Sequence, residues 1–477
     1  MFAKFLMRSV LSACAMTLSL PLLAQASGLP ASIEQVLTKN NLSGQSLSLA
    51  AIPLTGPGRP IFYNADTAIN PASAMKLVTT YSALELLGPA YQWKTELASD
   101  GILKDGVLQG NLYVKGGGDP KLTMEKLWLL LRDLKANGVT TVTGDLVLDN
   151  HYFSLPRLEP FDDDGSDQNK PFLVEPDSLL VNFKAMRIIA LGQQQQVKVS
   201  VEPPIDNLTV VNQIKLLPPG KCQDPARVFY KTVEGEGKTE LVMSGEIVSG
   251  CRSQSYVALL DHPQYVAGVI RSMWRELGGS IQGRDRVAPV VANSHVVARA
   301  YSADLTEVIR DVNKYSNNTM AKQVFLSIGA QHRTASDRDD AAASKRMINQ
   351  LMRHKKIPAQ HLTIENGSGL SRNERVSARE LAYMLKAAWE SPFSAEFISS
   401  LPIAGMDGTL RNRMKNTAVR GKAHLKTGTL RNVRALAGYV RDKQNNQWAL
   451  VAIINDDKPW SGGAVIDHAV IHLHQNP

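Results

Sequence analysis

A serine and a lysine three positions apart, Ser73 and Lys76, lie in PASAMKLVTT (71–80), where the pattern predicts the start of a helix. Because residues i and i+3 share one helix face, the lysine amine can reach the serine hydroxyl. A serine becomes a nucleophile when a neighbouring base takes its proton. The positive end of the helix dipole would favour an oxyanion near Ser73 and disfavour a protonated lysine. The same residues also fit an ordinary N-cap serine followed by a surface lysine.

A second motif, Ser316-Asn317-Asn318, occurs in KYSNNTMAKQ (314–323) at another predicted helix start. A serine at this position can relay a proton, and Asn318 can hold a substrate amide. The alternative is again a serine that only caps the helix.

A third motif, Lys426-Thr427-Gly428 followed by Thr429, lies on a predicted strand in AHLKTGTLRN (423–432). A cation beside two hydroxyl groups suits a carboxylate, and a glycine lets a substrate backbone approach closely. The alternative is a strand that simply ends in a turn.

Together, S-x-x-K, S-x-N and K-T-G in this order resemble the motifs of the penicillin-recognising serine transferases, namely penicillin-binding proteins and serine β-lactamases. The first two motifs are 243 residues apart (316 − 73), and this β-rich interval is too large for a class A β-lactamase. With such an insertion, the chain resembles the class C low-molecular-mass penicillin-binding proteins, the D-alanyl-D-alanine carboxypeptidase/endopeptidase family. The segments that share this likeness are GGGDPKLT (116–123), GDLVLDNHYF (144–153), EPDSLLVNF (175–183), ENGSGLSR (365–372) and LPIAGMDGTLRNR (401–413).

The resemblance implies a serine D,D-peptidase that cleaves D-Ala-D-Ala termini, D-Ala-meso-diaminopimelate cross-links of peptidoglycan, or both. Ser73 is expected to form the acyl-enzyme, with Lys76 as general base and Ser316 as proton shuttle. The backbone N–H groups of Ser73 and Thr429 are expected to form the oxyanion hole, and β-lactams are expected to acylate Ser73 for much longer than substrate does. The substrate-binding residues that the resemblance implies are Asn318 for the amide and Lys426, Thr427, Gly428 and Thr429 around the terminal carboxylate.

The second motif can be interpreted in another register. Tyr315-Ser316-Asn317 matches the Y-x-N of class C β-lactamases, although the wider likeness favours Ser316 and Asn318. The chain also has Asn317 and Asn366 where some family members have aspartate. A serine β-lactamase and a catalytically silent wall-binding scaffold are therefore the competing hypotheses. The three intact motifs argue against the scaffold, because a binding module needs neither Lys76 nor Ser316.

The arrangement of predicted elements indicates a multi-domain α/β protein. Two strands and a helix begin the mature chain, short β-type runs such as 179–183 dominate the middle, and helices and three strands return after about residue 295. We expect a transpeptidase/β-lactamase-like domain, an antiparallel sheet with flanking helices, into which β-rich domains are inserted. The expected boundaries are 1–26 for a signal peptide, 27–89 and 292–477 for the catalytic domain, 90–165 and 256–291 for inserted domain II, and 166–255 for inserted β-rich domain III.

The N-terminus is typical of a secretory signal. Lys4 and Arg8 precede an apolar stretch, and Ala24-Gln25-Ala26 is a small-x-small cleavage pattern. A lipobox ending at Cys14 is the alternative, but too few apolar residues precede it. We expect an exported, periplasmic protein in which the two remaining cysteines, Cys222 and Cys251, form a disulfide.

The composition excludes several classes of partner. The chain has 477 residues, 44% hydrophobic residues and a net charge of +9, which suits a globular protein attracted to anionic wall polymers or lipids. No basic run with interleaved aromatic residues indicates a nucleic-acid site. No ligand pattern predicts a metal or a cofactor. Peptidoglycan stem peptides and β-lactams are the expected partners, with at most peripheral membrane contact.

Overall fold

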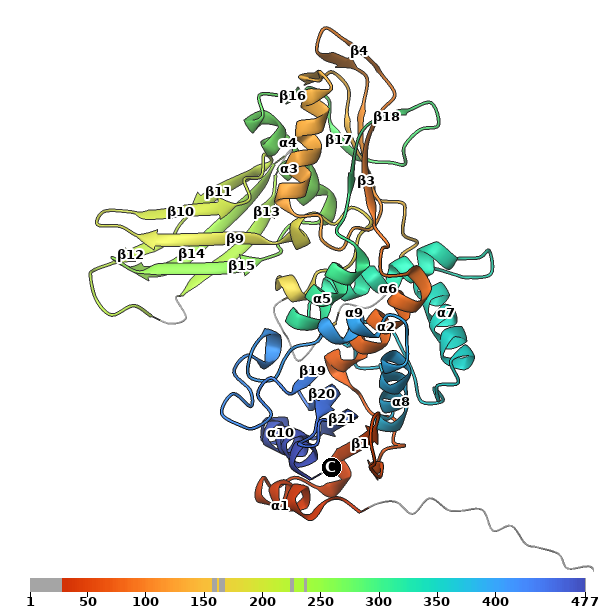
Figure 1. Ribbon diagram of the computed structural model, residues 1–477. Helices are drawn as coiled ribbons and strands as arrows, with labels where there is room; N and C mark the ends of the chain where they lie inside the picture. Colours follow the sequence, from red (N-terminus) through yellow and green to blue (C-terminus); the bar gives the residue numbers. More distant parts are fainter. Residues whose placement is uncertain (1–27, 157–160, 163–167, 224–226, 236–237, 477) are drawn as a thin grey trace, which may run out of the picture.

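The computed structural model describes residues 28–156, 161–162, 168–223, 227–235 and 238–476. The predicted signal peptide (1–26) and Cys14 lie outside these residues. Within the described ranges, no helix is long and apolar enough to cross a membrane. The structure confirms the predicted fold class, since helices flank an antiparallel sheet and further sheets are inserted between the two ends of the chain (Figure 1).

The sheet that carries the K-T-G motif has five antiparallel strands and contains both ends of the chain. The first strand of the chain pairs with the last one, so that Leu49 lies opposite Ala452. This pairing explains how motifs from distant parts of the sequence are brought together. In spatial order the strands are β19 (Ala423–Leu430), β20 (Val433–Arg441), β21 (Gln447–Asn455), β1 (Leu47–Pro53) and β2 (Ile61–Tyr63).

Both faces of this sheet are buried, and alternate residues of each strand belong to different cores. Ala50 and Val451 pack with the helices that carry the first two motifs, whereas Leu49 and Leu450 pack on the opposite face. Alternation follows from the two-residue period of a strand. Full burial of one such aliphatic side chain stabilises the fold by about 1.5–3 kcal/mol. Burial on both faces therefore stabilises the sheet that includes β19.

Helices cover the two faces of the sheet. Helices α1 and α10 pack together on one face, and α8 packs on the other, where α2, α5 and α6 complete the core (Figure 1). Ser377 and Glu380 form a capping box at the start of α8. The helices of this part are α1 (Ala31–Lys39), α2 (Lys76–Leu87), α5 (Leu305–Tyr315), α6 (Asn318–His332), α7 (Asp340–His354), α8 (Ala378–Trp389), α9 (Ser394–Ser399) and α10 (Pro459–Gln475).

The first inserted region contains two sheets and two helices. One sheet has the order β17-β8-β6-β3-β18 and the other β16-β7-β5-β4. The strands are β3 (Lys94–Ser99), β4 (Ile102–Lys104), β5 (Val107–Gln109), β6 (Leu112–Gly116), β7 (Thr141–Val142), β8 (Leu146–Asp149), β16 (Ser280–Ile281), β17 (Asp285–Val287) and β18 (His295–Tyr301). The helices are α3 (Met124–Ala136) and α4 (His262–Glu276).

The second inserted region is made of strands and extends to the left of α3 and α4 in Figure 1. Its strands are β9 (Met186–Gly192), β10 (Val197–Glu202), β11 (Leu208–Asn212), β12 (Lys215–Leu217), β13 (Val228–Glu234), β14 (Thr239–Val248) and β15 (Arg252–Val257). The predicted disulfide between Cys222 and Cys251 is confirmed, with the two Cα atoms 5.6 Å apart. It closes the loop that contains β13 and β14.

One expected strand is absent from the structure. The run at 179–183 was expected to be extended, but Asn182, Phe183 and Lys184 form a turn in which all three have positive φ. The apolar side chains Leu179 and Val181 are buried in the core of the inserted region, and the run makes only one isolated β-bridge among the described residues, between Val181 and Leu122, so burial and not sheet pairing explains the apolar run. The predicted domain boundaries stay predictions. Strand β18, which follows the expected boundary at residue 291, pairs with β3 of the inserted region.

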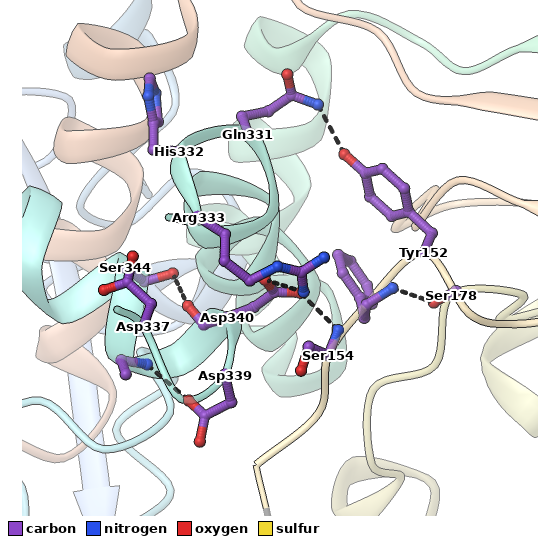
Figure 2. Close-up of polar contacts among 12 residues, drawn as sticks. Tyr152, Ser154, Ser178, Gln331, His332, Arg333, Asp337, Asp339, Asp340 and Ser344 are labelled. Atoms are coloured by element: carbon purple, nitrogen blue, oxygen red, sulfur yellow. Dashed lines mark hydrogen bonds and ion pairs between the residues drawn. The ribbon is translucent and has the colours of Figure 1, made fainter. Parts of the chain in front are cut away.

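A polar network joins residues 152–154 to helices α6 and α7. The buried carboxylate of Asp340 accepts hydrogen bonds from the Arg333 side chain (2.8 Å) and from the backbone N–H of Ser154 (2.7 Å). Figure 2 shows these two residues directed at Asp340, while the Gln331 amide donates to the Tyr152 hydroxyl (2.7 Å). The network therefore fixes the inserted region to the C-terminal end of α6, the helix that begins at the second motif.

Candidate active site

Ser73 does not cap a helix. It lies within one 3-10 turn, Ala72–Met75, which continues directly into α2, and neither N-cap position makes a side-chain capping bond. The Lys76 ammonium lies 3.0 Å from the Ser73 hydroxyl oxygen. The structure therefore favours the serine–lysine pair over the capping alternative.

Lys76 is fully buried, and its amine has three hydrogen-bond acceptors. These are the Ser73 hydroxyl, the Asn318 side-chain oxygen at 2.7 Å and the Ser368 carbonyl. Burial, followed by the nearby charge of Lys426, holds the pKa of Lys76 well below the usual lysine range. A lysine with a lowered pKa is neutral in a larger fraction of molecules, and only the neutral amine can accept the serine proton.

The second motif lies at the junction of two helices. Ser316 ends α5 in a left-handed conformation (φ 58°, ψ 35°), and Asn317 caps α6 by accepting a hydrogen bond from the Met320 N–H (3.0 Å). The capping function therefore belongs to Asn317, which leaves the side chains of Ser316 and Asn318 on the cleft. Tyr315 is 63% exposed and is not among the residues that line the cleft.

The third motif lies inside β19, not at a strand end. The buried Lys426 amine donates to the Ser316 hydroxyl at 2.8 Å, and the Thr427 hydroxyl bonds that of Thr409 at 2.9 Å. Burial lowers the pKa of Lys426 to about 7. Gly428 is required because a Cβ there would lie 2.4 Å from the Pro71 carbonyl oxygen, next to the nucleophile's turn.

All three motifs border one cleft of about 500 Å³. The turn that carries Ser73 contacts both lysine-bearing elements, α2 and β19. Basic and aromatic side chains also line the cleft. The cleft is lined by Ser73, Phe161, Phe172, Ser316, Asn318, Leu370, Thr409, Thr427, Thr429, Leu430, Arg431, Arg434 and Trp460.

Several residues of the site were not among the predicted site residues. The Ser368 carbonyl reaches the Lys76 amine, and Gly369 packs so closely that a Cβ would lie 2.0 Å from the Ala72 carbonyl oxygen. Glu374 is buried behind them. ENGSGLSR (365–372) was the available signal, because clustered glycines mark a close backbone approach, but they do not reveal what is approached.

Comparisons with known proteins agree with this geometry. The family model described as "D-Ala-D-Ala carboxypeptidase 3 (S13) family" matches residues 29–473. The D-alanyl-D-alanine carboxypeptidase of Actinomadura sp. (strain R39) is 28% identical over 449 residues, which cover 88% of this chain and 80% of that protein.

Solved structures show the same fold. The crystal structure of penicillin binding protein 4 (dacB) from Haemophilus influenzae is 22% identical, covers 93% of this chain and 99% of that chain, and has a TM-score of 0.77. The same Haemophilus protein complexed with a β-lactam gives a TM-score of 0.73 at the same identity and coverage.

Proposed function

The chain belongs to the D-Ala-D-Ala carboxypeptidase 3 (S13) family of serine peptidases, and on that premise we propose that Ser73 is its nucleophile and Lys76 its general base. The observation that carries the proposal is the 3.0 Å contact between the Ser73 hydroxyl and a fully buried amine with a lowered pKa. The substrate is a peptidoglycan stem peptide. The bond that is cleaved is a D-Ala-D-Ala bond or a D-Ala-meso-diaminopimelate cross-link.

In the acylation step, the Ser73 oxygen attacks the carbonyl carbon of the scissile amide and its proton passes to the Lys76 amine. The Ser316 hydroxyl, 2.8 Å from the Lys426 amine, relays this proton from Lys76 to the leaving nitrogen, so that Lys76 is neutral again for deacylation. The C–N bond then breaks, the amine product leaves, and Ser73 carries an ester. Water attacks this ester, releases the shortened peptide and restores the hydroxyl.

Substrate binding is assigned to groups that surround the nucleophile. Asn318 binds the amide before the scissile bond, while Lys426, Thr427 and Thr429 bind the terminal carboxylate. Asn318, Thr427 and Thr429 line the cleft, and the Lys426 amine contacts the Ser316 hydroxyl, which also lines it. The backbone N–H groups of Ser73 and Thr429 form the oxyanion hole. Removal of one such donor typically lowers the rate by roughly 10²–10³.

We further propose that the protein acts in the periplasm after removal of residues 1–26. The signal-like N-terminus supports export. The Cys222–Cys251 disulfide supports it independently, because disulfides persist in oxidising compartments. Any membrane contact is peripheral.

The first test is acylation of the mature protein by a fluorescent penicillin, with Ser73→Ala and Lys76→Met as variants. We expect a stable adduct in the wild-type protein and none in Ser73→Ala, with the same thermal unfolding midpoint for both. Release of D-alanine from a D-Ala-D-Ala pentapeptide should be lost in parallel. An adduct that decays within seconds without peptide hydrolysis would instead indicate a β-lactamase. Peptide hydrolysis that survives in Lys76→Met would contradict the assignment of the base.

A further inference from the structure

The loop between α7 and α8 folds around the carboxylate of Glu374. One carboxylate oxygen accepts three backbone hydrogen bonds, each 3.0 Å long, from the N–H groups of Glu365, Asn366 and Gly367. The side chain is completely buried, and its second oxygen accepts no hydrogen bond from a described residue. The position of this carboxylate is therefore fixed by the loop that it organises.

The same loop touches the proposed base. The Ser368 carbonyl accepts a hydrogen bond from the Lys76 amine. The side-chain oxygen of Asn366 accepts hydrogen bonds from the Ser368 N–H (2.9 Å) and hydroxyl (2.7 Å). One turn further along α2, the Thr79 hydroxyl donates to the Gly367 carbonyl at 2.6 Å. The loop held by Glu374 is thus fastened to α2 beside the nucleophile's turn.

Charges of both signs act on Lys76 from three different elements. Lys426 on β19 and Lys322 on α6 lower the pKa of Lys76, and Glu374 in the loop raises it. Lys322 is itself paired with Glu175 at 2.8 Å. Burial raises the pKa of Glu374 itself, while the three backbone N–H groups and the charge of Lys76 act in the opposite direction and favour the carboxylate. In its ionised form, Glu374 counteracts the effect of the two lysines on Lys76.

We propose that Glu374 is a positioning residue for catalysis: it holds the loop whose Ser368 carbonyl orients the Lys76 amine, and its buried negative charge sets the pH range in which Lys76 works. This inference rests on the proposed role of Lys76 as general base. Because an opposite charge favours the protonated amine, Glu374 keeps the base strong enough to accept the Ser73 proton although Lys76 is buried beside other lysines.

The test is the pH dependence of the second-order rate of penicillin acylation in Glu374→Gln. Glutamine keeps an oxygen for the three N–H groups but removes the charge. The acid limb of the profile reports protonation of the base in the free enzyme. We expect this limb to move to lower pH by roughly one unit, the low end of the effect of a close opposite charge. On that limb the variant should then acylate up to roughly tenfold faster than the wild-type protein.

Two controls separate charge from shape. Glu374→Asp keeps the charge on a shorter side chain, so it should lower the rate without moving the acid limb. Glu365→Gln removes a charge from the same loop, where the carboxylate bonds Ser371 and Asn373, and should leave the limb unmoved. Glu374→Asn is a second neutral variant for use if Glu374→Gln does not fold.

An acid limb that stays in place or moves to higher pH in a folded neutral variant overturns the inference. A uniform loss of rate at every pH also overturns it, because that result indicates a purely structural residue. In both cases a wild-type adduct that is lost in Ser73→Ala leaves the proposed function intact. Absence of any wild-type adduct overturns the proposed function and this inference with it.

Discussion

Substitutions at three adjacent positions, Tyr315→Phe, Ser316→Ala and Asn317→Ala, should have three different effects. The Ser316 hydroxyl accepts a hydrogen bond from the buried Lys426 amine, and general acid–base groups of this kind contribute roughly 10²–10⁴ to the rate. We therefore expect Ser316→Ala to slow penicillin acylation by at least 10², with little change in the free energy of unfolding.

The neighbouring positions serve as matched controls. The Tyr315 side chain is 63% exposed, so Tyr315→Phe should change the rate by no more than about twofold, as surface substitutions usually do. Asn317 caps α6 through the Met320 N–H. Asn317→Ala should therefore lower the free energy of unfolding by about 1 kcal/mol and leave the acylation rate close to that of the wild-type protein.

The assay combines the second-order rate of fluorescent-penicillin acylation with denaturant unfolding of the same preparations. The opposite pattern, a large loss of rate in Tyr315→Phe with Ser316→Ala spared, would refute the reasoning. It would show that the motif is used in the Y-x-N register of class C β-lactamases. A rate loss in Asn317→Ala larger than that in Ser316→Ala would refute the assignment of helix capping to Asn317 and of proton relay to Ser316.

Three further predictions follow from the structure. Because burial lowers the pKa of Lys426 to about 7, the unfolded chain binds more protons between about pH 7 and the ordinary lysine pKa of about 10.4. Stability should therefore rise with pH in that window, and Lys426→Met should reduce this rise in pH-dependent melting, because Lys76, whose pKa is also lowered, still contributes to it. The same variant should lose peptidase activity. Replacing Cys222 and Cys251 by serine opens a loop with a sequence separation of 29. This double substitution should lower the free energy of unfolding by about 3.6 kcal/mol in the chain-entropy model and leave acylation unchanged. A melt identical to that of the wild-type protein would contradict the predicted stabilisation by the disulfide. Gly88 and Gly369 both have positive φ, but a Cβ meets nothing within 4 Å at Gly88 and lies 2.0 Å from a carbonyl oxygen at Gly369. Gly88 has φ 82° and ψ 155°, a region that only glycine adopts readily, so Gly88→Ala should cost about 1–3 kcal/mol of stability. Gly369→Ala should cost more and also abolish acylation, and equal losses in the two variants would contradict the close contact at Gly369.

The local elements were largely predictable from the sequence. The helices and the three strands expected after about residue 295 are present as α5–α10 and β19–β21, because side-chain periodicity acts over a few positions. The expected strand at 179–183 was wrong, because a short apolar run shows that residues are buried but not whether they pair with a strand. The Cys222–Cys251 disulfide was predictable because export leaves the two cysteines with one possible pairing.

The sequence by itself determined which residue types face the cleft, since S-x-x-K, S-x-N and K-T-G are local patterns in a fixed order. Tertiary structure alone decided how they act together. Lys76 and Asn318 are 242 positions apart, and their 2.7 Å contact exists because α2 packs against α6 in the folded chain. The burial that lowers the pKa of Lys76 and the carboxylate of Glu374 behind it are likewise properties of packed surroundings. Desolvation and charge proximity depend on distances in space, which spacing along the chain does not encode.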